Sequence, residues 1–123
     1  MKKLYDGMIG LAIGDALGVP VEFKTRQEIA ENPVREMREY GTHHQARGVW
    51  SDDTSLTLAL VDSIVKSSGI DYNDIMERFS AWLLYGDYTA AGEVFDVGNA
   101  TGRAIMNYGH GTAPLQCLSL IHI

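Results

Sequence analysis

Three consecutive oxygen-bearing side chains, Ser51, Asp52 and Asp53, form the stretch of this sequence best suited to chemistry. They stand just before an apolar pattern in which Leu56 and Leu60 recur at a spacing of four, which predicts a helix from about residue 52 to 66. Adjacent carboxylates repel each other, and the free N–H groups of a helix N-terminus relieve only part of that repulsion. A cation would relieve the rest. Hard oxygen ligands of this kind suit Mg²⁺, Ca²⁺ or Mn²⁺ rather than zinc.

The same residues have a plainer interpretation, which stays open at this point. Ser-Asp-Asp-Thr before an apolar run is also the pattern of an ordinary helix N-cap with acidic residues in the first turn. Taken alone, the four residues favour capping. The metal hypothesis therefore depends on what the rest of the chain brings to the same place.

Two further acids lie earlier in the chain, at the end of a predicted helix over residues 4–17. Asp15 stands among small residues, and we expect its carboxylate to hydrogen-bond loop backbone rather than to bind a ligand directly. Glu22 lies in an extended exit after Pro20, where its side chain points either into a cleft or out to water. A glycine stripe at positions 7, 10, 14 and 18 indicates close approach of another backbone or of a ligand. For Gly7 and Gly10 we expect close helix packing.

Other segments complete an all-α architecture. A capping box at residues 25–28 starts a short helix, Asp71 is a plausible N-cap for a helix that Gly86 ends, and residues 99–108 form another helix. Residues 34–47, including two adjacent histidines, are expected to form a surface loop covering the approach to Trp50. The pattern shows almost no strand-type alternation and no repeat.

Composition narrows the class of protein. The 123 residues carry a net charge of −6 with no Lys/Arg cluster, which argues against nucleic acid or an anionic membrane as a partner. The single cysteine, Cys117, excludes an internal disulfide framework and fits a reducing compartment. The N-terminal apolar stretch is broken by acids, so we expect neither a signal peptide nor a membrane span, and predict a cytoplasmic protein.

Two blocks of the sequence together resemble a known family. Residues 14–23, reading GDALGVPVEF, and residues 48–54, reading GVWSDDT, are similar to the N-terminal half of the ADP-ribosylglycohydrolases, a family that includes the dinitrogenase-reductase-activating glycohydrolases. Residues 96–101, reading DVGNAT, resemble the ribose-side loop of that family with weaker specificity. The resemblance covers nearly the whole chain.

The resemblance implies an all-helical hydrolase that removes ADP-ribose from protein side chains or small acceptors with a two-metal centre, usually Mg²⁺ or Mn²⁺. It places Ser51, Asp52 and Asp53 on one metal, with serine where the family more often has threonine. Glu22 and Asp53 are the implied catalytic residues, with Glu22 as proton acceptor or gate. Asp96 and Asn99 correspond to ribose contacts. Cleavage at the anomeric carbon passes through an oxocarbenium-like transition state, which suits a carboxylate that activates water.

One block of the family pattern is missing. No Asp-x-Asp-Thr follows Thr54, and no carboxylate follows Asp96, so the second metal site is incomplete. We interpret residues 1–117 as the N-terminal part of a single helical domain. Residues 118–123, reading LSLIHI, match one reading frame of a sequencing adapter and are interpreted as a non-native tail of a truncated gene; the alternative is a genuine apolar tail.

Two other classes of function remain as alternatives. One is a non-catalytic relative resembling the crystallins of the same fold, and the other is a small helical interaction domain in which Asp52 and Asp53 only cap a helix. Retention of Glu22, Ser51 and both aspartates argues against a purely structural role. The leading hypothesis is a metal-dependent hydrolase acting on an ADP-ribosylated protein or small molecule.

Overall fold

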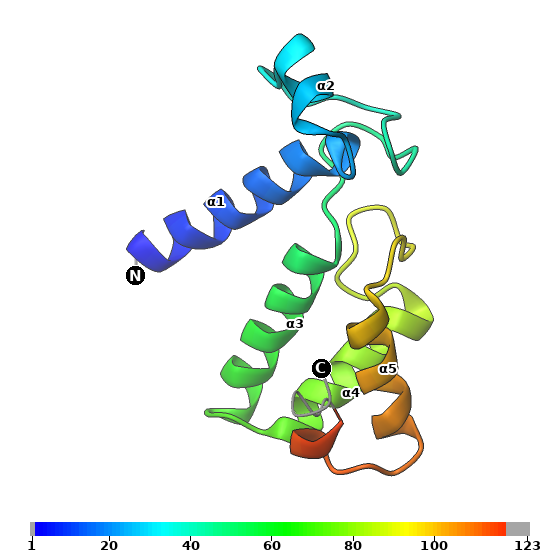
Figure 1. The fold of residues 1–123 in the computed structure, drawn as a ribbon. Helices are drawn as coiled ribbons and strands as arrows, with labels where there is room; N and C mark the ends of the chain where they lie inside the picture. The colour runs from blue at the N-terminus through cyan, green and yellow to red at the C-terminus, as the bar shows by residue number, and fades with distance from the viewer. Residues whose placement is uncertain (1, 118–123) are drawn as a thin grey trace. The chain divides into compact units, whose positions relative to one another are not determined.

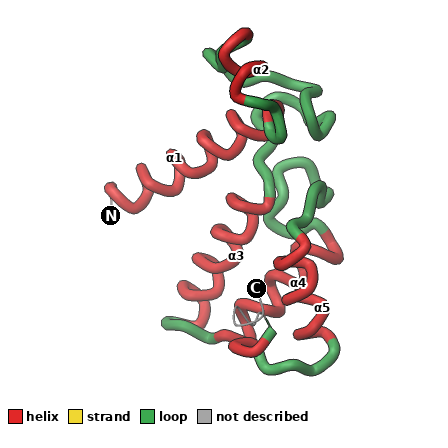
Figure 2. The backbone as a smooth tube through the Cα atoms, viewed as in Figure 1, coloured by secondary structure: helices red, strands yellow, loops and turns green. Residues whose placement is uncertain are grey.

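The computed structural model describes residues 2–117, and this part of the chain is helical, with no strand within it (Figures 1 and 2). The elements in order are α1 (Lys2–Gly18), the 3₁₀ helix η1 (Val19–Val21), α2 (Arg26–Glu31), α3 (Asp52–Ser67), α4 (Tyr72–Tyr85), α5 (Asn99–Gly109) and the 3₁₀ helix η2 (Pro114–Gln116). The all-α prediction is confirmed. The predicted tail at 118–123 lies outside the described residues.

The chain divides into two compact units, residues 1–54 and 55–123, and each is described by itself. The first unit holds α1, η1, α2, the long connection that follows α2, and the first turn of α3. The second holds the rest of α3 with α4, α5 and η2. The acidic stretch identified in the sequence therefore ends the first unit.

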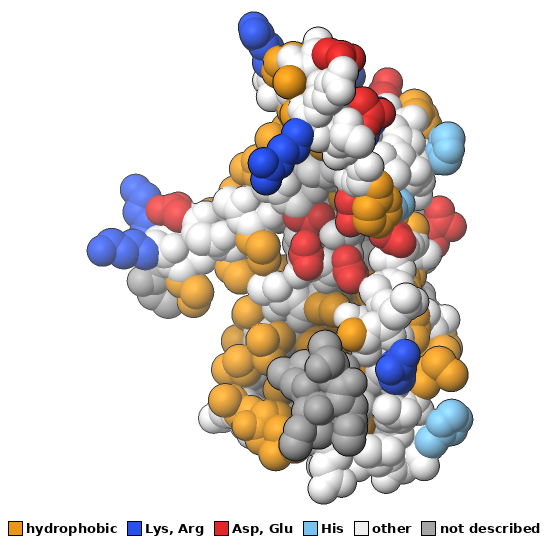
Figure 3. Space-filling model, viewed as in Figure 1, with side chains coloured by type: hydrophobic (Ala, Val, Ile, Leu, Met, Phe, Trp, Pro, Cys, Tyr) orange, Lys and Arg blue, Asp and Glu red, His pale blue; other side chains and the backbone are white. Residues whose placement is uncertain are grey.

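Helix α1 is apolar around most of its circumference. Leu4, Tyr5, Ile9 and Ile13 are each more than two-fifths exposed, and hydrophobic side chains are visible along its surface (Figure 3). By length and composition the stretch Lys2–Val21 could cross a membrane, a criterion that soluble core helices and signal sequences also meet. The absence of a membrane span stays a prediction, favoured by the acid in the last turn of this helix.

Close helix packing was predicted for Gly7 and Gly10, and the described residues do not show it. A Cβ built at Gly7 or Gly10 would meet no other atom within 4 Å among the described residues, so the expectation of close helix packing at these two positions is wrong there. The stripe instead leaves the backbone of α1 open. Gly10, Gly14 and Gly18 line a pocket described below, which is the second of the two explanations that the spacing allowed.

The core of the second unit gathers where α4, α5 and η2 meet. Met76, Trp82, Ile105 and Cys117 are buried together, and partly buried apolar side chains, among them Leu56, Phe79, Leu83 and Val97, pack around them. Trp82 is only 1% exposed and is the largest fully buried side chain in the described part of the chain. Phe79, Trp82 and Leu83 stand three and four positions apart along α4, so they share the face that this core buries.

Local signals set the helix ends as the sequence indicated. Thr25 and Glu28 form the capping box of α2, each side chain bonded to the other's backbone N–H. Asp71 accepts the backbone N–H groups of Asn73 and Asp74 at the start of α4. Gly86 ends α4 with φ at 75°, a left-handed conformation that glycine adopts without strain.

Candidate functional site

The carboxylate of Asp15, in the last turn of α1, organises the start of α3. It accepts the backbone N–H of Ser51 at 3.0 Å and that of Thr54 at 3.1 Å, together with both hydroxyls at 2.6 Å. Helix N-terminal N–H groups need acceptors, and a carboxylate is favoured there by the helix dipole. The predicted structural role of Asp15 is therefore confirmed, with a more specific partner than loop backbone.

This arrangement changes the interpretation of the acidic stretch. Asp15 supplies the main cap from another helix, and the Ser51 hydroxyl adds only a long 3.4 Å contact to the backbone N–H of Asp53. Asp52 and Asp53 then stand in the first turn of α3 without being the principal caps. The alternative in which these two aspartates merely cap the helix loses its main support.

A pocket of about 550 Å³ opens beside this network, entirely within the first unit. Ser51 and Asp53 line it from the start of α3, and Glu22 lines it from the exit of η1. The glycine stripe of α1 and neighbouring apolar residues supply the remaining wall, comprising Gly10, Leu11, Gly14, Asp15, Gly18, Val19 and Val21. Three of the predicted site residues thus share one pocket, although Glu22 lies 29 positions before Ser51 in the sequence. Asp52 is not among the lining residues.

Asp52 is half-buried, and its environment disfavours the charged form. Partial burial raises the pKa of its carboxyl above the ordinary aspartate value, and the neighbouring charge of Asp53 raises it further, with a smaller contribution from Asp15. The nearby Ser51 hydroxyl lowers the pKa and offsets part of this effect. Three carboxylates within one turn of helix and its cap leave negative charge that a cation would stabilise.

The donor set fits a hard divalent cation. Ser51, Asp52 and Asp53 offer oxygen atoms only, the ligand type that Mg²⁺ and Mn²⁺ select. The Ser51 hydroxyl directs its proton to Asp15 at 2.6 Å, so its oxygen presents lone pairs away from that bond. These are the residues that would hold a metal in this unit.

Glu22 has a partner that the sequence did not reveal. The Nε2 atom of His43 lies 2.6 Å from a carboxylate oxygen of Glu22. His43 belongs to the connection predicted as a surface loop, and no spacing rule links residues 21 positions apart in irregular chain. The only sequence signal for His43 was its place in a polar loop that was expected to cover the approach to Trp50.

Asp96 and Asn99 lie in the second unit. Asp96 has a left-handed backbone with φ at 49°, which aspartate adopts more readily than most residues. Asn99 is the first residue of α5, whereas the N-cap is Gly98 and no side chain caps this end. Asn99 therefore does not cap this helix. Asn99 instead lines a pocket of about 580 Å³ that also includes Arg103.

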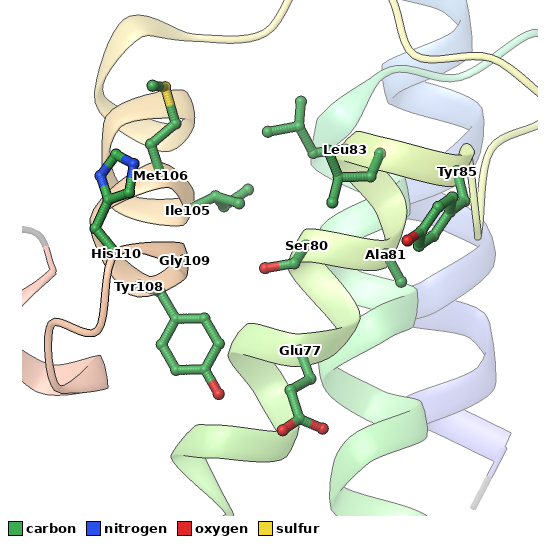
Figure 4. A pocket seen from close by; sticks show the side chains of 11 residues that line it. Glu77, Ser80, Ala81, Leu83, Tyr85, Ile105, Met106, Tyr108, Gly109 and His110 are labelled. Atoms are coloured by element: carbon green, nitrogen blue, oxygen red, sulfur yellow. The ribbon is translucent and has the colours of Figure 1, made fainter.

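A second pocket of this unit, about 460 Å³, lies between α4 and α5 (Figure 4). Its walls are mainly apolar, with Leu83 and Ile105 pointing toward each other, and Glu77, Ser80 and His110 add a few polar atoms. None of the predicted site residues lines it. It lacks the convergent carboxylates of the pocket in the first unit.

Comparison with known proteins independently supports the family resemblance seen in the sequence. A family model described as ADP-ribosylglycohydrolase matches residues 1–119. An ADP-ribosylarginine hydrolase of Serratia proteamaculans is 33% identical over 92% of this chain and 30% of its own length, and one of Pseudomonas putida is 38% identical over 85% and 28%. The ADP-ribosyl-dinitrogen reductase glycohydrolase of Rhodospirillum rubrum is 38% identical over 88% of this chain and 35% of its own length. The chain thus spans about a third of the length of these relatives.

Proposed function

This chain belongs to the ADP-ribosylglycohydrolase family, and on that premise we propose that it forms part of a hydrolase that releases ADP-ribose from modified arginine side chains. The observation that carries the proposal is the pocket in which Glu22, Ser51 and Asp53 meet beside the Asp15 network. Arginine is proposed as the modified residue because two ADP-ribosylarginine hydrolases match most of this chain.

The residues of the pocket have separable roles in this reaction. Glu22 takes a proton from the attacking water, because it is an exposed carboxylate lining the pocket that neither caps α3, as Asp15 does, nor is a proposed metal ligand, as Asp53 is. Asp53 orients that water and stabilises positive charge as it develops at the anomeric carbon. Asp15 holds Asp53 in place relative to Glu22, because it ties the first turn of α3 to the end of α1.

A divalent cation, Mg²⁺ or Mn²⁺, is proposed to bind through Ser51, Asp52 and Asp53. When bound it would supply a charge that holds ribose hydroxyls and acidifies a water molecule. Asp96 and Asn99 are proposed to contact the ribose. A second cation, implied by the family resemblance, would need ligands beyond those in this sequence.

The proposed reaction is tested by release of ADP-ribose from an ADP-ribosylated arginine peptide. The active protein would be this chain joined to, or mixed with, a C-terminal segment carrying Asp-x-Asp-Thr. Asp53→Ala should abolish release in the presence of Mg²⁺, whereas Asp6→Ala, which removes an exposed carboxylate of the same unit outside the pocket, should leave it intact. Equal activity in both variants would exclude Asp53 from the chemistry.

We further expect the 123-residue chain alone to bind Mg²⁺ weakly and not to turn over substrate. Mg²⁺ demands near-octahedral oxygen coordination, and one cluster of ligands provides only part of it. Strong Mg²⁺-dependent release of ADP-ribose by this chain alone would show that a second cluster of metal ligands is not required. The crystallin-like alternative predicts neither Mg²⁺ binding nor release in any form of the protein.

A further inference from the structure

The connection between α2 and α3 folds back onto the exit of η1. Thr42 donates its backbone N–H to the carbonyl of Pro20 at 3.1 Å and its hydroxyl to the carbonyl of Glu22 at 2.7 Å. At Gly41 the two backbones approach so closely that a Cβ would overlap the carbonyl oxygen of Pro20. Residues 41–43 are therefore fixed against residues 20–22 by contacts to main-chain carbonyls, independently of any charged group.

His43 continues this contact to the side chain of Glu22. Its Nε2 atom lies 2.6 Å from Oε2 of Glu22, and the imidazole is 10% exposed while the glutamate side chain is 44% exposed. The ring also meets Phe23 edge to face, with centroids 5.8 Å apart. The histidine is thus held from two sides, and it holds the more exposed glutamate.

A glutamate needs such a partner at this place. It has three rotatable side-chain bonds, and ordering a side chain of this kind costs conformational entropy. It also faces a pocket that Asp53 lines, so like charges favour rotamers that turn away. A short hydrogen bond to an ionised carboxylate is among the stronger ones and offsets both effects.

We propose that His43 is a positioning residue, whose Nε2–H donates to Oε2 of Glu22 and leaves Oε1 as the oxygen that takes the proton from water. The inference rests on the proposed function, since it assigns His43 a role through Glu22. Within residues 41–43, Gly41 and Thr42 fix the position of the backbone, and His43 fixes the orientation of the Glu22 carboxylate. His43 itself does not touch the reacting atoms.

The kinetic test uses the active protein and ADP-ribosylated arginine peptide. His43→Ala should lower kcat by about tenfold to a hundredfold, the cost of misplacing a reacting group by roughly 1 Å, with little change in KM. His43→Gln, whose amide can donate from a similar place, should recover much of the loss. His44→Asn is the matched control, because His44 is exposed, adjacent and in a left-handed conformation that asparagine accepts.

A double-mutant cycle separates positioning from a general folding effect. If His43 acts only through Glu22, His43→Ala should cost nothing further in a Glu22→Gln background. A similar fold-loss in both backgrounds, or an unchanged kcat in His43→Ala alone, would overturn the proposal.

A spectroscopic test needs no turnover, so it distinguishes this inference from the proposed function. Two-bond ¹H–¹⁵N correlations of the 123-residue chain in Mg²⁺-free buffer should show a proton on Nε2 of His43, and the signal should shift in Glu22→Gln. A ring protonated on Nδ1 alone would overturn the pairing. Inactive wild-type protein with the Nε2–H signal present would refute the proposed hydrolase while leaving the pairing intact.

Discussion

The carboxylate of Asp15 accepts both the backbone N–H and the hydroxyl of Thr54, a residue 39 positions further along the chain. Thr54 is only 2% exposed, so its polar atoms have little access to water. Removing the carboxylate would leave these donors, and those of Ser51, without acceptors. Buried donors that lose a partner cost much more than the net worth of the bond.

We therefore expect Asp15→Ala to lower the free energy of unfolding of the chain by about 2–3 kcal/mol. The measurement is urea unfolding followed by circular dichroism. Asp6→Ala, an exposed acid of the same helix, should change the free energy by less than about 0.5 kcal/mol. Equal effects of the two substitutions would mean that the Asp15 network contributes nothing to folding.

Substitution of Asp52 should have the opposite effect on the stability of the fold. Its folded-state pKa is raised, first by burial and then by Asp53, so the ionised carboxylate at neutral pH destabilises the folded state. Asp52→Asn is expected to raise the melting temperature in EDTA. Added Mg²⁺ should stabilise the wild type more than the variant. A lower melting temperature for the variant in EDTA would restore the capping interpretation.

The glycine stripe permits a matched pair of substitutions. Neither Gly7 nor Gly14 has an atom within 4 Å of a built Cβ, so alanine at either position should stabilise α1 by roughly 0.5–1 kcal/mol. Of these two glycines, only Gly14 lines the pocket. In the active protein, Gly14→Ala should therefore raise KM for the ADP-ribosylated peptide, while Gly7→Ala should not. A raised KM in both would point to a change in α1 rather than in the pocket.

Acid should weaken the second unit through one charged cluster. Arg78 contacts Asp62 and Asp74 at 2.6 Å, and the Tyr88 hydroxyl donates to Asp62 at 2.7 Å. The bond from Tyr88, with smaller contributions from Lys66 and Arg78, lowers the pKa of Asp62.

A lowered folded-state pKa contributes stability above the unfolded value, near 4, that is lost as the pH falls through the folded value. Tyr88→Phe should therefore lower the melting temperature at pH 7 more than at pH 2.5. Tyr85→Phe, at a tyrosine 76% exposed, is the control and should change neither. A Tyr88→Phe effect that does not vary with pH would assign the loss to packing.

Asn99 offers a test of the ribose contact. Because Gly98 is the N-cap of α5 and no side chain bonds there, Asn99→Ala should change the free energy of unfolding by less than about 0.5 kcal/mol. Release of ADP-ribose by the active protein should nevertheless fall. A loss of stability near 1 kcal/mol with intact release would instead indicate a capping function.

The sequence by itself predicted the helices and also named Glu22, Ser51 and Asp53, whose roles in the candidate site stay predictions. Hydrophobic spacing and cap residues are local, so the capping box of α2, the Asp71 cap and the start of α3 at Asp52 could be predicted directly. The block that holds Ser51, Asp52 and Asp53 and the block that holds Glu22 also identified the family. Local chemistry and motif order require no knowledge of distances.

The tertiary structure alone decided which side chains meet. It assigned the capping of α3 to Asp15, put Glu22 and Asp53 around one pocket, opened Gly10 and Gly14 to that pocket, and brought His43 to Glu22. These contacts join residues 21 to 39 positions apart across irregular chain. No helical or strand period extends over such a connection, so the partners of a carboxylate there depend on how the loop folds back.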